Sequence, residues 1–130
     1  MRSSICLVVL TILAMFPAFS YANDDLANFE LVAENEHLLL YLNPATTEVA
    51  VYDRESGLVW YSNPPERDKL DKIARGEMKE RLNSQLLLSY YTPGDRLITV
   101  NNYTESVKNN QFDITPIVDG VRIDYLFGKQ

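Results

Sequence analysis

The chain has 130 residues, enough for one domain and a short targeting segment. Its formal net charge is −6, with acidic and basic residues interspersed, so it would on average repel a phosphate backbone, and nucleic acid is excluded as an expected partner. The one cysteine, Cys6, lies near the N-terminus, so the rest of the chain offers neither a disulfide framework nor a thiolate metal site.

Residues 1–22 have the pattern of a secretory signal peptide. Arg2 supplies a positive start, an uncharged apolar run follows, and Ser20 and Ala22 are small residues at the minus-three and minus-one positions of a cut after Ala22. The alternative is an uncleaved membrane anchor, because the uncharged run is close to the lower limit for a span. Pro17 interrupts that run and no basic cluster follows it, so we expect cleavage and a secreted or envelope-located product.

Strand patterns follow a polar lead at residues 23–28. The two-residue spacing of side chains on one face predicts strands at residues 38–42 and 48–53. A strand can begin at residues 29–33, and the strand after the Gly57 loop is expected at residues 58–61. Pro44 marks one turn between them, and Gly57 fits a hairpin loop that requires positive φ. We expect an antiparallel meander in which Trp60 is buried, because Leu58 and Trp60 share one face.

Residues 67–82 change to a helical period. The apolar positions recur at every third or fourth residue and form one stripe: Leu70, Ile73, Ala74, Met78 and Leu82. Gly76 interrupts this stripe, so the pattern predicts either a broken helix or two short helices. The stripe is expected to pack on the sheet, with a partner-binding face as the alternative.

The remainder of the chain again reads as strands and turns. Residues 86–91 carry few polar positions on either face, which predicts a central strand covered on both sides. Pro93 and Gly94 stand where a type II turn requires them, before a strand at residues 96–100. Asp119-Gly120 predicts a hairpin between residues 112–118 and 121–127. The whole pattern predicts a mainly β protein, an antiparallel β-sandwich with one helical insertion.

No combination of nucleophile, base and orienting group can be assembled, so no catalytic residue is assigned. His37 is the only histidine, and it lacks companion ligands, so neither a metal site nor a cofactor is expected. Glu66 and Asp68 open the predicted helix, and a carboxylate pair could serve acid–base hydrolysis. Acidic residues are also favoured there by the helix dipole, and either Asp68 or Asn63 can cap the helix, so we favour a capping role.

The candidate binding residues are aromatic: Trp60, Tyr61, Tyr90 and Tyr91. Such side chains can form a stacking platform for a sugar, but they are also ordinary filler of a sandwich. Neighbours on a strand face opposite ways, so at most one of each pair can face a given ligand. Separately, Asn102-Tyr103-Thr104 matches the N-glycosylation sequon, which matters only in a eukaryotic secretory pathway.

Four segments resemble the beginning of an uncharacterised family of large extracellular proteins of Gram-positive spore-forming bacteria: residues 31–36 (LVAENE), 59–64 (VWYSNP), 84–86 (SQL) and 119–125 (DGVRIDY). Members of this family look like a mutarotase-type β-sandwich followed by a barrel of glycoside-hydrolase type. The resemblance implies a sandwich over residues 29–128 in a carbohydrate-related setting. The barrel that would hold any catalytic carboxylates is missing, so no catalytic residue is carried over.

Two functions therefore stay open. The first is a non-catalytic N-terminal accessory domain of a secreted carbohydrate-active protein, truncated before its barrel and left with an unsatisfied docking surface. The second is a free-standing extracellular module that binds a glycan or another protein. The expected partners are a carbohydrate and the missing C-terminal barrel, with a membrane only if the signal segment stays uncleaved.

Overall fold

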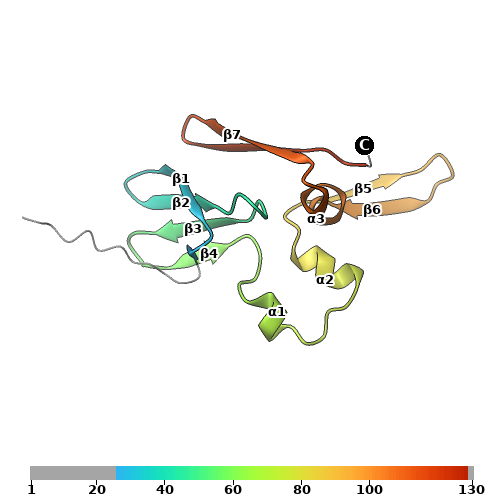
Figure 1. Cartoon of the computed structure of the whole chain (residues 1–130), viewed down its shortest axis with the longest axis horizontal. Coiled ribbons are helices and arrows are strands. Elements are labelled where there is room, and N and C mark those ends of the chain that lie inside the picture. Colours follow the sequence, from blue (N-terminus) through green and yellow to red (C-terminus); the bar gives the residue numbers. More distant parts are fainter. Residues whose placement is uncertain (1–25, 129–130) are drawn as a thin grey trace, which may run out of the picture.

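The structure is a computed structural model that describes residues 26–128, and the predicted signal peptide lies outside the described residues (Figure 1). The strands are β1 (Glu30–Glu34), β2 (Leu38–Leu42), β3 (Val49–Asp53), β4 (Val59–Tyr61), β5 (Leu87–Tyr91), β6 (Leu97–Asn101), β7 (Phe112–Ile117) and β8 (Gly120–Tyr125). The helices are α1 (Arg67–Leu70), α2 (Glu77–Leu82), α3 (Asn102–Glu105) and the 3-10 helix η2 (Val107–Asn109). Over residues 26–128, no helix is long and apolar enough to cross a membrane.

The first four strands form one antiparallel sheet in the order β1-β2-β3-β4, which confirms the predicted meander. The β3–β4 loop has the expected chemistry, because Gly57 has a φ of 71°. In register, Leu40 faces Val51 and Val51 faces Trp60, so these three side chains share one face of the sheet.

The burial expected for Trp60 is wrong: its side chain is 55% exposed. Trp60 lies on β4, which is one edge of the sheet, whereas β8 approaches the sheet at the other edge, beside β1. A shared face with Leu58 does not bury it, because Leu58 is exposed as well. Alternation along a strand identifies a face but does not identify what covers that face.

The helical insertion consists of two short helices, as the glycine indicated. Helix α1 ends at Leu70, and Gly76, with a φ of 53°, is the residue before α2, so α2 does not extend back through it. The apolar stripe does not pack on the sheet, because Leu70, Ile73 and Met78 are exposed and only Ala74 is buried in its middle. Helices of four and six residues separated by a loop cannot hold a shared stripe in one line.

The hairpin of β5 and β6 corrects a second expectation. In the described part of the chain, β5 pairs only with β6, and every residue of β5 is exposed, so it is not a covered central strand. Figure 1 shows this hairpin extending away from the four-stranded sheet. Its turn has Asp95, with a φ of 54°, in the left-handed region, whereas a type II turn would have placed Gly94 there.

The hairpin of β7 and β8 is confirmed. Ile117 faces Gly120 across the turn, and Asp119 adopts a φ of 58°, a conformation that aspartate tolerates better than most residues. The protein is therefore mainly β, and residues 26–128 hold antiparallel strands in three sheets of four, two and two strands. The β-sandwich stays a prediction.

Candidate functional site

The four aromatic candidates do not form one platform. Trp60 and Tyr61 lie on β4, whereas Tyr90 and Tyr91 lie on β5, and Figure 1 shows these strands at opposite ends of the molecule. Tyr61 packs edge-on against Phe29, with ring centroids 6.3 Å apart, which accounts for its ring as a packing element. Trp60, Tyr90 and Tyr91 are exposed and separately available to a ligand.

A groove lies on the face of the sheet that carries Trp60. It encloses about 440 Å³ between the first three strands and the β7–β8 turn, and its lining residues are Ala33, Glu34, Asn35, Leu38, Leu40, Val51 and Asp119. The lining combines apolar side chains with the carboxylates of Glu34 and Asp119. The Glu34 carboxylate is already paired with Arg54, so it is partly neutralised within the protein.

The centre of the molecule holds a buried polar junction, which we define as Thr47, Asn63, Gln85, Asn102 and Tyr125. The Gln85 amide occupies its middle: its Oε1 accepts from Thr47 Oγ1 at 2.9 Å and from Asn102 Nδ2 at 2.7 Å. Its Nε2 donates to Asn63 Oδ1 at 2.9 Å. Neutral hydrogen bonds of this kind contribute about 1 kcal/mol each when satisfied, and leaving a buried partner unsatisfied costs more.

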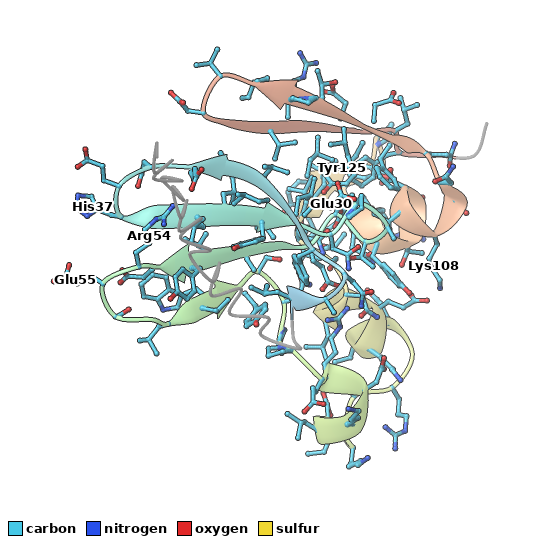
Figure 2. All side chains as sticks on the ribbon, turned by 60° about the vertical axis from the view of Figure 1, so that its left-hand side comes forward. Glu30, His37, Arg54, Glu55, Lys108 and Tyr125 are labelled. Carbon is cyan, nitrogen blue, oxygen red and sulfur yellow. The ribbon has the colours of Figure 1, made fainter. Side chains whose placement is uncertain are left out.

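The junction joins the three sheets. Asn63 Nδ2, just after β4, donates to the carbonyls of Leu82 and Ser84 at 2.8 and 3.0 Å, which ties the first sheet to the end of α2. Tyr125 donates from β8 to Thr47 Oγ1 at 2.9 Å, and Figure 2 shows Tyr125 where β8 approaches the four-stranded sheet. Polar contacts therefore hold the three sheets together, as an apolar core does in most domains of this size.

Asn102 is the most enclosed member of the junction. It is fully buried, and its Oδ1 accepts from the backbone N–H groups of Gln85 and Leu86, each at 3.0 Å. Its side chain therefore fixes the start of β5. Because this amide is enclosed and already bonded, the sequon at this position cannot be glycosylated in the folded chain.

A second polar contact fastens α1 to the first sheet. The Arg67 guanidinium pairs with the Glu48 carboxylate, just before β3, and also donates to Asn83 Oδ1. Both ends of the pair are largely enclosed, so breaking it would leave a poorly solvated charge. Sequence reasoning noted Arg67 only as part of the helix start, because no local pattern links it to Glu48.

The two carboxylates at the start of α1 do not face a common substrate position. Glu66 pairs with Lys69, and Asp68 pairs with Lys79 at 2.8 Å. The capping role expected for Asp68 or Asn63 is not observed: Glu66 holds the N-cap position without a side-chain bond, and the Asn63 amide belongs to the junction. The hydrogen bond from Lys79 lowers the pKa of Asp68 below its ordinary value.

Three further carboxyls have lowered pKa values. The Ser56 hydroxyl lowers the pKa of Asp53, backbone N–H groups of Ala74 and Ile73 lower that of Asp71, and Lys108 lowers that of Glu80. A general acid in hydrolysis needs the opposite shift, since it must stay protonated near neutral pH. All three groups are therefore suited to holding a charge rather than to donating a proton.

His37 lies at the turn between β1 and β2 and is exposed, as expected. Figure 2 shows it beside Arg54, whose backbone N–H donates to the His37 carbonyl at 2.8 Å. Asn35 Oδ1 shapes the turn by accepting from the backbone N–H groups of His37 and Leu38 at 2.9 and 2.8 Å. Within residues 26–128, no three histidine, cysteine or acidic side chains gather as metal ligands would.

Comparisons with protein families, with curated proteins and with solved structures found no match to this chain. The resemblance carried by residues 31–36, 59–64, 84–86 and 119–125 therefore stays a prediction from those motifs.

Proposed function

We propose that the chain is a non-catalytic accessory domain of a secreted carbohydrate-active protein, and that it docks on another polypeptide domain. One observation carries the docking role: apolar side chains of the strands lie on the surface. Within residues 26–128, only four apolar residues are buried, whereas sixteen large hydrophobic side chains are exposed. Monomeric soluble proteins rarely leave large connected apolar patches uncovered.

The energetics of the separate sheets support this role. A two-stranded hairpin is marginally stable in water by itself, and three or more strands or a covering layer are needed. The β5–β6 hairpin has neither in the described part of the chain, and its strands expose Leu87, Leu88 and Leu97. Docking on an apolar surface would supply the missing layer.

The non-catalytic part of the proposal is supported by the carboxylates. A glycosidase holds two carboxyl groups about 5–10 Å apart across the scissile bond, and one must retain its proton. Glu66 and Asp68 are each paired with a lysine instead, and the pKa of Asp68 is lowered. The proposed export rests on the signal-peptide pattern, and the proposed carbohydrate setting rests on the family resemblance.

A glycan-binding module is the second candidate, and the exposure of Trp60 favours it. The indole lies on the same face as the groove, because Trp60 is the cross-strand partner of the groove residue Val51. An exposed indole beside a concave surface can stack on a sugar ring. This candidate needs no second polypeptide.

Two assays of the purified chain separate these functions. We expect no turnover of oligosaccharides or aryl glycosides, and no glycan binding in a titration that follows the fluorescence of Trp60. Turnover that is lost in Glu66→Gln or Asp68→Asn would contradict the proposal and would make α1 part of an active site. Because Trp60→Ala removes the only tryptophan, glycan binding by the variants is measured by calorimetry. Binding that is lost in Trp60→Ala but kept in Val118→Ala, an exposed apolar control in the β7–β8 turn, would select the second candidate.

A further inference from the structure

Strand β5 has an unprotected edge. In the described part of the chain it pairs with β6 on one side only, and residues 87–91 contain no charge, no proline and no bulge. Proteins usually protect open edges with such devices, because unpaired N–H and C=O groups recruit another strand. Two other outer strands have them: β1 carries Glu30 and Glu34, and β7 carries Pro116. Strands β4 and β6 lack charge and proline as well, but β4 has only three residues, and a short edge strand is itself a form of protection.

The sequence of β5 is complementary to itself in antiparallel register. Pairing two copies about Ser89 places Leu88 opposite Tyr90 on one face and Leu87 opposite Tyr91 on the other. Each leucine thus meets an aromatic side chain, and aromatic–aliphatic cross-strand pairs are favourable. The only residue that meets its own kind is Ser89, which is small and neutral.

Charge and area are compatible with a second copy. The net charge of −6 opposes self-association in general, but β5 itself contributes nothing to it. Leu87, Leu88, Tyr90 and Tyr91 are 51, 46, 48 and 71% exposed. A fully exposed aromatic side chain has about 150–250 Å² of accessible surface, so the exposed surface of these four side chains is on the order of 500 Å² per copy. A standard stable interface uses about 800 Å² per partner, so the expected association is weak.

We propose that two copies of the chain associate through antiparallel pairing of their β5 strands, with Ser89 at the twofold axis. The product is a four-stranded sheet in the order β6-β5-β5-β6. The association does not depend on the proposed function, because it uses the free edge of β5, whereas docking uses the apolar faces of the sheets, including those of the β5–β6 hairpin. Each copy also hides an edge of five residues that has neither charge nor proline.

Cysteine cross-linking tests the position of the axis. Cys6→Ser removes the only native thiol, and Ser89→Cys is then introduced as the single cysteine. The protein is purified in the form that its host produces. Opposite residues in an antiparallel pair have Cα atoms about 4.5–5.5 Å apart, within the range of a disulfide. The matched control is Thr99→Cys, because Thr99 is the half-buried cross-strand partner of Ser89 on β6, with its hydroxyl 2.8 Å from that of Ser89.

In the proposed dimer, the two copies of Thr99 lie three strand spacings apart, about 14 Å, which is too far for a disulfide. Mild oxidation should therefore convert most of the Ser89→Cys variant to a covalent dimer and leave the Thr99→Cys variant monomeric. Cross-linking of neither variant, of Thr99→Cys alone, or of both to the same extent would overturn the proposal.

Charge variants test the same axis without a covalent bond. Ser89→Lys and Ser89→Glu each place like charges opposite each other, so both should be monomeric in sedimentation experiments at concentrations where the unmodified chain dimerises. An equal mixture of the two should restore the dimer, which shows that both variants still fold. A monomeric unmodified chain at every concentration, a dimeric Ser89→Lys variant, or a mixture that stays monomeric would each contradict the pairing.

Discussion

Asn102 shows how one residue determines the position of a strand. Its carbonyl oxygen accepts two backbone N–H groups at the start of β5, and its amide donates to Gln85 at 2.7 Å inside the junction. Sequence reasoning marked the same asparagine only as part of a sequon. No local pattern reveals that it is buried, because its partners are 16 and 17 residues earlier in the chain.

Replacing Asn102 should destabilise the protein strongly. Asn102→Ala leaves two buried N–H groups without an acceptor, at about 1–3 kcal/mol each, so we expect a loss of at least about 2 kcal/mol in the free energy of unfolding. Urea denaturation followed by circular dichroism measures it. The matched control, Asn28→Ala, changes an exposed asparagine and should stay within about 0.5 kcal/mol. Equal midpoints for the two variants would show that the junction is unimportant.

Trp60 leads to the opposite expectation. A buried tryptophan would cost about 3–5 kcal/mol on truncation to alanine. Since the side chain is 55% exposed, Trp60→Ala should cost clearly less than that. Trp60 is also the only tryptophan, so its emission in the native protein should be readily quenched by iodide. A quenching-resistant native signal together with a large loss of stability would place the indole in an interior.

Among the loops that connect the elements, Gly76 and Gly94 have different roles, because only Gly76 requires a backbone conformation that favours glycine. Gly76 has a φ of 53° and a ψ of −129°, a backbone region that side chains disfavour, whereas Gly94 has no positive φ. Neither has a neighbouring atom within 4 Å of an added Cβ, so backbone conformation alone distinguishes them. Gly76→Ala should destabilise the protein by about 1 kcal/mol or more, and Gly94→Ala should be neutral or slightly stabilising. The reverse order in thermal unfolding would contradict this conformation of the α1–α2 loop.

The contact between α2 and η2 predicts a pH dependence. Lys108 lowers the pKa of Glu80 below its ordinary value of 4.5, so the folded state binds a proton there less readily than the unfolded state. The stabilisation is therefore present above pH 4.5 and is lost as the pH falls through the lowered pKa of the folded state. Lys108→Met should flatten the acid limb of the unfolding free energy, and Lys72→Met, at an exposed lysine, should leave it unchanged. Identical acid limbs in both variants would exclude this coupling.

For the whole molecule, local pattern was sufficient for the strands and for several turns but not for the contacts between strands, and it gave the wrong type for the turn at Gly94. The meander, the two short helices divided at Gly76 and the hairpin at Asp119 all follow from periodicity and turn chemistry. Those signals act within a few residues. The burial of Trp60 and the central position of β5 were predicted wrongly. An apolar strand indicates that another layer should pack on it, but it does not indicate which part of the chain, or which other chain, supplies that layer.

The candidate site was predictable only as a set of aromatic residues. The sequence identified Trp60, Tyr90 and Tyr91, which are exposed, but it could not show that β4 and β5 belong to separate sheets. The polar junction was not predicted at all. Thr47 and Tyr125 are 78 residues apart, and single polar residues in loops carry no period that would link them.

Site-specific photo-crosslinking tests the docking role most directly. A photoreactive residue replaces Leu97, an exposed apolar position on β6, in cells that produce the chain, and the exposed polar position Lys72 serves as the control. The account predicts one discrete adduct, with a polypeptide other than this chain, from position 97 and none from position 72. No adduct from position 97, or the same adducts from both positions, would contradict the proposal that the apolar strands dock on another polypeptide.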